Sequence, residues 1–312
     1  MGTSLSNEDL SIVIPLHNEQ PIVDELIKRV MTSCREFRNL QLILVDDGST
    51  DNTWGAIHRN SRELPQLVGI RLSRNFGHQK AVLAGLGECT YENIAIIDGD
   101  LQDPPELLPE MVELLNGSGV EVVYGQRISR DGESVFKKLT AVVFYRFFSR
   151  VVPFPVPLNV GDFRVFRSRI LNHVLQSKDP SPYLRGIFAH LGFPSLPFQY
   201  ARQKRFSGRT KYGLKKMSLF ATNAVFGFSD LPFRLFFRFA LFSLSLAFIG
   251  SGYAIFHSLT VGSLPGWVSL FILNLYMGSL NFVFLSLIAK YITLNFEISL
   301  SRPRWVIGER IN

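Results

Sequence analysis

The sequence predicts an α/β fold that is built on a mostly parallel sheet and followed by two apolar segments. In the N-terminal third, short apolar runs of strand length alternate with segments whose apolar residues recur at helical spacing. Polar and acidic clusters come directly after three of these runs. Near the C-terminus, residues 239–256 and 267–289 contain no charged residue, and each stretch is long enough to cross about 30 Å of hydrocarbon.

The predicted strands and helices alternate along the N-terminal third. Residues 10–16 have the pattern of a buried strand, and residues 19–34 carry apolar side chains on one helical face. Further strands are predicted at 40–45, 68–72 and 93–97, and further helices at about 51–62 and 78–89. This alternation favours right-handed crossovers, a parallel sheet and a ligand crevice at the carboxyl ends of the strands. We therefore expect the clusters at 17–19, 46–49 and 98–100 to meet there.

The charge of the chain favours anionic partners. The formal net charge is +7 and the pI is near 9.5, but the basic residues cluster beside aromatic-rich segments that lead to the apolar stretches. This placement indicates a membrane surface or phosphorylated substrates rather than nucleic acid. Cys34 and Cys89 lack the spacing of a disulfide framework or a zinc site, and we expect buried thiols.

Two further segments have an interfacial character. In residues 135–152 and 211–228, Phe, Val and Leu alternate with Lys and Arg, and the segments are too short or too charged to span a membrane. They are predicted to be amphipathic helices in the membrane interface, the alternative being ordinary surface helices on the sheet. The spans themselves are expected at about 234–257 and 267–290.

The distribution of positive charge predicts the orientation in the membrane. The loop 257–266 between the two spans has no Lys or Arg, whereas basic residues flank the other ends, namely Arg234, Arg238, Lys290, Arg302, Arg304 and Arg310. Residues 1–10 contain no apolar core of signal-peptide length. We expect a cytoplasmic catalytic domain at 1–230, two transmembrane helices within 231–294 and a cytoplasmic tail at 295–312.

The strongest chemical signal is the run Asp-Gly-Asp-Leu-Gln-Asp at 98–103, which follows an apolar strand. A hard cation such as Mg²⁺ or Mn²⁺ prefers oxygen donors of this kind and commonly binds the phosphates of a substrate as well. An isolated Asp-x-Asp is common in turns. Placed at a strand end beside two other polar clusters, the run predicts a metal–diphosphate site.

Two other segments could contact a phosphorylated ligand. Asp47 could accept a hydrogen bond from a nucleobase or a ribose hydroxyl, although its neighbours also suit a local turn and a helix cap. The basic loop 205–212 could close over phosphates, or it could remain solvated near anionic lipid headgroups. The sequence contains no G-x-G-x-x-G after its first strand and no P-loop, so a dinucleotide-dependent oxidoreductase or a P-loop NTPase would lack its phosphate-binding loop. A G-x-S-x-G elbow is also absent.

Four motifs resemble those of the inverting GT-A glycosyltransferases of family 2. They are Ser-Ile-Val-Ile-Pro-Leu-His-Asn-Glu at 11–19, Val-Asp-Asp-Gly-Ser at 45–49, Arg-Asn-Phe-Gly at 74–77 and Asp-Gly-Asp-Leu-Gln-Asp-Pro-Pro-Glu at 98–106. Within this family the chain is similar to the dolichyl-phosphate mannose synthase group, and above all to bacterial bactoprenol glucosyltransferases with two C-terminal spans. The resemblance covers essentially the whole chain.

The resemblance implies roles for individual residues. Contacts with the nucleoside are implied for Pro15, His17, Glu19, Val45 and Asp47, and contacts with the donor phosphates and sugar for Asp98, Gly99 and Asp100. Asp100 and Gln102 match the metal ligands, and the phosphate-binding basic residues are Arg127, Arg205 and Lys211. Asp162 matches a segment near the acceptor, and it joins Asp98 and Asp100 as a candidate catalytic residue. The chain departs from many relatives at His17, where Tyr or Phe is frequent, and at Gly99, where Ala is frequent.

The implied activity is metal-dependent, inverting transfer of a hexose to polyprenyl phosphate at the bacterial plasma membrane. UDP-glucose is the preferred donor and undecaprenyl phosphate the acceptor, with GDP-mannose, UDP-GlcNAc and UDP-4-amino-arabinose derivatives as alternative donors. A homo-oligomer, such as a tetramer, is also expected. A processive polysaccharide synthase would need more spans and a Gln-x-x-Arg-Trp motif, which Arg304 and Trp305 match only in part. A non-catalytic scaffold would have lost acidic motif residues, and these are all present.

Overall fold

The computed structural model describes residues 5–128, 160–177, 182–202, 266–300 and 303–312, together with single positions between 238 and 260. The chain forms two compact units. The first contains residues 1–221 and 303–312, and the second contains residues 222–302.

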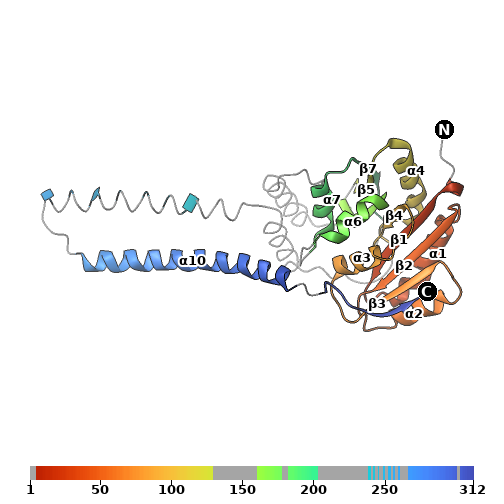
Figure 1. Cartoon of the computed structure of the whole chain (residues 1–312), viewed down its shortest axis with the longest axis horizontal. Helices are drawn as coiled ribbons and strands as arrows, with labels where there is room; N and C mark the ends of the chain where they lie inside the picture. Colours follow the sequence, from red (N-terminus) through yellow and green to blue (C-terminus); the bar gives the residue numbers. More distant parts are fainter. Residues whose placement is uncertain are drawn as a thin grey trace. The chain divides into compact units, whose positions relative to one another are not determined.

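The first unit is built on an eight-stranded sheet with the order β7-β5-β6-β4-β1-β2-β3-β8 (Figure 1). The strands are β1 Asp9–Leu16, β2 Asn39–Asp46, β3 Leu67–Leu72, β4 Asn93–Ile96, β5 Val122–Arg127, β6 Val160–Arg167, β7 Ser195–Tyr200 and β8 Ile307–Ile311. β1 pairs in parallel with β2 and β4, β2 with β3, and β5 with β7. β6 is antiparallel to β4 and β5, and β8 is antiparallel to β3. The predicted mostly parallel α/β sheet is confirmed.

The described helices of this unit surround the sheet. They are η1 Leu5–Asn7, η2 Gln20–Ile22, α1 Val23–Ser33, α2 Thr53–Ser61, α3 His78–Leu86, η3 Pro105–Leu107, α4 Leu108–Ser118, α6 Ser168–Gln176 and α7 Leu184–Leu191. The three helices predicted from periodicity are confirmed as α1, α2 and α3, with ends a few residues inside the predicted ranges. Pro21 lies in the 3-10 turn that precedes α1, and Gly87 caps α3. Proline favours a helix start and glycine a helix end, which accounts for these boundaries.

Both faces of the central strands are buried, as is usual for parallel strands. In β1, Ile12 and Ile14 belong to the core cluster that also contains Leu26 of α1. On the opposite face, α3 packs closely, because a Cβ on its Gly85 would lie 2.5 Å from Cγ1 of Val13. This packing holds α3 directly against β1 and β2.

The C-terminus joins the sheet of the first unit. Residues 295–312 are expected from sequence to be a tail, yet 307–311 form the edge strand β8. The carboxylate of Glu309 accepts a 2.7 Å hydrogen bond from Nε1 of Trp54, and Cγ1 of Ile311 would lie 2.5 Å from a Cβ at Gly69. Main-chain pairing and these two contacts fasten the last residues to an edge that would otherwise be unpaired.

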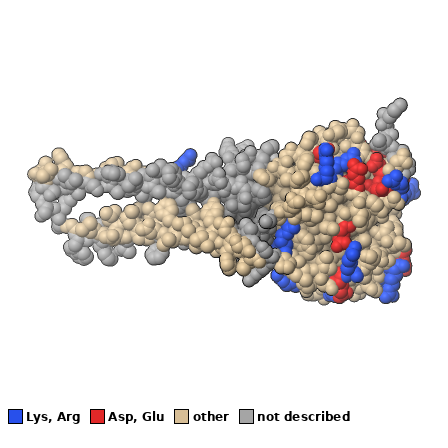
Figure 2. Space-filling model, in the orientation of Figure 1, with Lys and Arg blue, Asp and Glu red and all other residues tan. Residues whose placement is uncertain are grey.

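The second unit contains α10, Trp267–Ser299, which extends beyond the span predicted at 267–290. Many of its apolar side chains are exposed, among them Leu270, Tyr276 and Ile292. On the face drawn in Figure 2, most of the coloured charged side chains lie on the first unit.

Several expectations concern residues outside the described ranges. These are the amphipathic helices at 135–152 and 211–228, the residues Arg205 and Lys211, and most of the first predicted span at 234–257. Among the described residues, no helix combines the length and the apolar character needed to cross a membrane.

Candidate functional site

The loops that follow β1 and β2 are tied together at the carboxyl edge of the sheet. The ring of His17 lies with Nδ1 2.9 Å from the carbonyl oxygen of Asp47. Asn18, at a φ of 55°, donates its N–H to Ser49 Oγ over 2.9 Å, and Glu19 donates its N–H to Thr53 Oγ1 over 3.0 Å. Pro15 and Val45, also expected near the nucleoside, are register partners in β1 and β2. The structure thus brings all five nucleoside candidates to one edge.

Asp47 extends this connection to the loop after β3. Its Oδ1 accepts the N–H of Phe76 over 2.7 Å, and its Oδ2 accepts the N–H of Gly77 over 3.0 Å. Burial raises the pKa of Asp47, and the two amide hydrogen bonds oppose that rise. Gly48 allows the loops to approach, because it has a φ of 59° and a Cβ there would lie 2.4 Å from the carbonyl carbon of Arg74. The carboxylate of Asp47 is therefore not used for the local turn. Asp46 stabilises that turn, because it accepts the N–H of Ser49.

The acidic loop after β4 has a constrained backbone. A Cβ on Gly99 would lie 2.4 Å from Cδ2 of Leu16, so this loop packs directly on the end of β1. Leu101 is buried at a φ of 57°, a conformation that costs a residue with a side chain about 1–3 kcal/mol. Oδ1 of Asp100 accepts the N–H of Gln102 over 3.1 Å. The strained turn therefore places Asp100 and Gln102 on the same short loop.

Asp103, at the end of the same loop, is fully buried. Its Oδ1 accepts a 2.5 Å hydrogen bond from the hydroxyl of Tyr200 and lies 3.7 Å from Nε of Arg202. Arg127 lies 3.5 Å from the same carboxylate and donates from Nε to the Tyr200 oxygen over 3.2 Å. Arg202 also approaches Asp100, at 3.9 Å. Two guanidinium groups are thus positioned beside the acidic loop, where they could bind phosphate oxygens.

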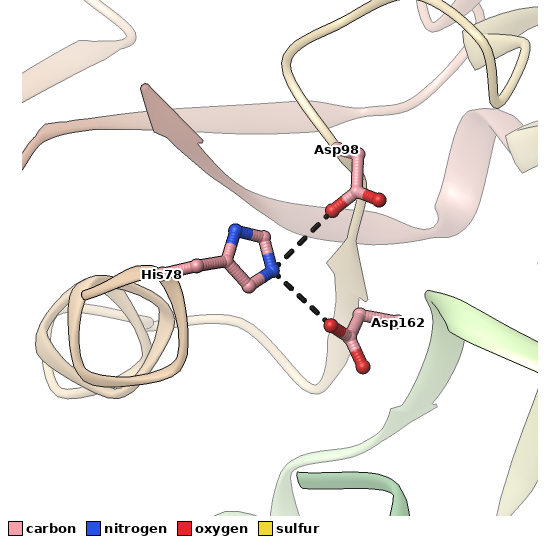
Figure 3. A group of neighbouring side chains, drawn as sticks. All are labelled: His78, Asp98 and Asp162. Carbon is pink, nitrogen blue, oxygen red and sulfur yellow. Dashed lines mark hydrogen bonds and ion pairs between the residues drawn. The ribbon is translucent and has the colours of Figure 1, made fainter. Parts of the chain in front are cut away.

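A second cluster lies beside the acidic loop (Figure 3). His78 is the first residue of α3, and its Nε2 lies 3.1 Å from Oδ2 of Asp162 and 3.5 Å from Oδ1 of Asp98. Asp162 is on β6, which pairs with β4, and this pairing brings it close to Asp98. Gln79 donates to Oδ2 of Asp162 over 2.8 Å, and Arg185 donates to Oδ1 over 3.0 Å.

The charges in this cluster are strongly coupled. Burial by itself would lower the pKa of His78, but the hydrogen bond with Asp162 and the charge of Asp98 raise it to about 9. Burial raises the pKa of Asp98 to about 6, although His78 opposes this. Burial also acts to raise the pKa of Asp162, but Arg185 and His78 hold it well below its usual value. At neutral pH the cluster therefore contains an imidazolium between two carboxylates.

Two groups of residues could hold a metal ion. One ligand atom from each of His78, Asp98 and Asp162 lies within 4.8 Å of the others. The second group is Asp100 with Gln102, whose donors are both oxygens, as Mg²⁺ and Mn²⁺ prefer. Asp162 in the first group already binds Arg185, and this group also includes a nitrogen donor. The second group, with oxygen donors alone, fits the chemistry of a hard cation better.

Sequence reasoning missed several residues of these clusters. Asp103 lies within the acidic run, and His78 follows the Arg-Asn-Phe-Gly motif, so both had a local signal. Arg185, Tyr200 and Arg202 had none, because they reach the site only through the packing of β6, α7 and β7. Arg205 and Lys211 lie outside the described residues.

Comparison with known proteins places the chain in a family. Residues 11–175 match glycosyl transferase family 2. The uncharacterized glycosyltransferase YkcC of Bacillus subtilis is 34% identical over 95% of this chain and 92% of its own length. YkoT of the same organism, also an uncharacterized glycosyltransferase, is 36% identical over 96% of this chain and 90% of its own. The bactoprenol glucosyl transferase of Shigella phage SfX is 28% identical over 96% of this chain and 99% of its own. The chain is therefore a glycosyltransferase and belongs to glycosyl transferase family 2.

Proposed function

We propose that this glycosyltransferase transfers glucose from UDP-glucose to undecaprenyl phosphate, with inversion at the anomeric carbon. The observation that carries the proposal is the arrangement of Asp98, Asp100 and Gln102 beside the expected nucleoside contacts. This arrangement of side chains occurs in a chain that aligns over 96% of its length with a bactoprenol glucosyl transferase. The guanidinium groups of Arg127 and Arg202 at the edge of the acidic loop suit the phosphate groups of a nucleotide-sugar donor.

The reaction requires little acid–base chemistry from the protein. A polyprenyl phosphate is already anionic at neutral pH, so its oxygen can attack the anomeric carbon without losing a proton. The main requirement is to bring the acceptor oxygen in line with the leaving group, because orientation lowers the barrier of a two-substrate reaction. A single in-line displacement on an α-linked donor then yields a β-linked lipid product.

The leaving nucleoside diphosphate is the group that needs stabilisation. A Mg²⁺ or Mn²⁺ ion held by Asp100 and Gln102 would neutralise charge on the diphosphate. Arg127 is held by Asp103 and Tyr200 in an orientation suited to the same charge. Arg205 and Lys211 are assigned to this role by resemblance. By the same resemblance, Asp98 is assigned to the donor and Asp162 to the acceptor.

Membrane attachment is part of the proposal. Residues 222–302 leave the first unit and return to it, since 303–312 contribute β8 to the same sheet that contains β1. Two crossings by the uncharged stretches would satisfy this connection, because an even number of spans returns the chain to the same side. Exposed apolar side chains on α10 also favour a lipid environment. We place the protein in the bacterial plasma membrane, with a cytoplasmic catalytic domain, as a homo-oligomer.

The alternatives have less support. GDP-mannose, UDP-GlcNAc and UDP-4-amino-arabinose derivatives remain alternative donors for the same chemistry. For a processive synthase, Arg304 would have to serve the acceptor, but its guanidinium donates to the carbonyl oxygens of Leu175 and Ser177 over 2.6 and 2.5 Å. That arginine has a structural partner in the first unit. A non-catalytic scaffold does not explain why the acidic residues are all present.

The test is transfer from radiolabelled UDP- and GDP-sugars to undecaprenyl phosphate in detergent, with Mg²⁺, with Mn²⁺ or with chelator. The expected result is label in the lipid phase from UDP-glucose, only when metal is present. Transfer from another sugar would correct the donor, and transfer in chelator would overturn the metal assignment. Absence of transfer from every donor would contradict the proposed function.

A further inference from the structure

We propose that His78 is a positioning residue. By contacting both Asp98, assigned to the donor, and Asp162, assigned to the acceptor, it would fix the positions of the two carboxylates relative to each other. This inference rests on the proposed function. The sequence motifs assign no role to His78, but its ring lies between Asp98, in the loop after β4, and Asp162 on β6 (Figure 3).

The backbone at His78 is fixed by its neighbour Gly77, which is bound to the loop after β2. Gly77, which precedes it, has a φ of 97° and donates its N–H to Asp47. The carbonyl of Gly77 in turn accepts the N–H groups of Lys80 and Ala81 in the first turn of α3. The helix is itself packed tightly on β1 and β2. A continuous set of contacts therefore leads from Asp47, through the start of α3, to the imidazole.

The far end of the ring meets the two carboxylates. Nε2 is within hydrogen-bond distance of Asp162 and within ion-pair distance of Asp98. Oδ1 of Asp98 is buried and has no hydrogen-bond partner among the described residues, so its ion pair with the imidazole is a direct contact that holds this oxygen. Asp162, by contrast, also binds Gln79 and Arg185. Loss of the ring would thus displace the carboxylate of Asp98 more than that of Asp162, which keeps two other partners.

The same geometry argues against a metal ion between these three residues. The Nε2–Oδ2 distance of 3.1 Å is that of a direct hydrogen bond, and a ring nitrogen that donates its proton to Asp162 has no lone pair free for a metal ion. Arg185 binds Asp162, and the buried Arg164 lies 4.0 Å from it, so the surroundings already carry positive charge. Asp100 and Gln102 suit Mg²⁺ or Mn²⁺ better, because both offer oxygen donors.

The consequence for catalysis is geometric. Without a group between them, two carboxylates repel each other, and Asp98 would rotate away or take up a proton. Displacing a group that orients the reacting sugar by about 1 Å can lower the rate about 100-fold. The expected nucleoside contacts lie at the ends of β1 and β2, so we expect the affinity for UDP to persist.

The experiment compares His78→Ala and His78→Gln with the wild type and with His58→Ala, a control histidine on α2. For each protein, kcat and KM for UDP-glucose are measured with undecaprenyl phosphate, and UDP and Mn²⁺ binding are measured by calorimetry. Glutamine is included because its single amide nitrogen carries two hydrogens and can donate to both carboxylates.

We expect His78→Ala to lower kcat about 100-fold, with KM, UDP affinity and Mn²⁺ affinity within about twofold of wild type. His78→Gln should recover at least a tenth of the lost activity, and His58→Ala should behave as wild type. Unchanged kcat in His78→Ala, or equal losses in both His78 variants, would overturn the positioning role.

Loss of Mn²⁺ binding in either His78 variant would instead assign the cluster to metal binding, and it would overturn the inference even if no sugar transfer were detected. An inactive wild type that still binds UDP and Mn²⁺ would count against the proposed function, not against this inference. If His78→Ala fails to fold, His78→Gln is compared with the wild type instead. A lower kcat with unchanged KM would support the positioning role, and an unchanged kcat would overturn it.

Discussion

The hydroxyl of Tyr200 at the end of β7 donates a 2.5 Å hydrogen bond to the fully buried carboxylate of Asp103 in the acidic loop. The two residues are 97 positions apart in the sequence, and the bond joins the edge of the sheet to the proposed metal-binding loop. Burial and the charge of Asp103 raise the pKa of Tyr200, which keeps the phenol protonated as a donor.

We predict that Tyr200→Phe destabilises the protein by about 1–3 kcal/mol, because a buried carboxylate loses a hydrogen-bond donor. Chemical unfolding monitored by circular dichroism would measure this change. Tyr124→Phe, in the neighbouring strand β5, is the matched control and should cost less. Equal effects of the two substitutions would show that the Tyr200 hydroxyl contributes nothing specific.

Asp100→Ala should reduce transfer roughly 100-fold or more, because the charge on the leaving diphosphate would lose its metal-mediated stabilisation. The protein should remain folded and associated with membranes. Activity is measured with radiolabelled donor at increasing Mn²⁺ concentration. Asp24→Ala, which removes an exposed carboxylate paired with Arg59, serves as the control. Full activity of Asp100→Ala would contradict the metal assignment.

Gly99→Ala should destabilise the protein by about 1–3 kcal/mol, since the added methyl group would meet Cδ2 of Leu16 at 2.4 Å. Valine has no Cδ atom, so the same substitution in a Leu16→Val background should cost less. A double-mutant cycle on unfolding free energies measures this coupling. Additive effects would mean that the loop accommodates alanine by moving away from Leu16. Such a movement would agree with the frequent occurrence of alanine at this position in relatives.

The raised pKa of His78 predicts a loss of stability at alkaline pH. The folded protein binds this proton more tightly than the unfolded chain, since the pKa rises from 6.5 to about 9. The stabilisation is therefore complete below about pH 6.5 and is lost as the pH rises through about 9. Burial raises the pKa of Cys34 and Cys89 from 9.0 to about 12, so these thiols also lower stability as the pH rises above about 9, and they do so equally in the wild type and in a His78 variant.

This prediction is measured as the unfolding midpoint in urea between pH 6.5 and 9.5, for the wild type and His78→Gln. The wild type should lose more stability over that interval than the variant, which has no titrating ring at this position. Parallel pH profiles of the two proteins would rule out His78 as the source.

Most of the first four strands and the helices between them could be predicted from the sequence. Their apolar periodicity is local, and Pro21 and Gly87 mark boundaries near α1 and α3. The acidic run at 98–103 and the clusters at 17–19 and 46–49 could likewise be assigned to strand ends, because strands alternating with helices predict a parallel sheet. That assignment brought together the candidates for the nucleoside and for the metal.

Partners far apart in the sequence could not be predicted in this way. β6 runs antiparallel between β4 and β5, and only this pairing places Asp162 near Asp98. β8 pairs with β3 although most of the chain separates them, so residues expected to be a tail became part of the sheet.

The sequence by itself determined the class of fold, the family and the acidic residues that carry the proposed chemistry, because each is encoded in short motifs and local periodicity. Only the tertiary structure decided that His78 lies between Asp98 and Asp162, and that Tyr200, Arg127 and Arg202 surround Asp103. The physical reason is that such clusters depend on the register of strands and the packing of helices, which bring together side chains that have no local relationship in the chain.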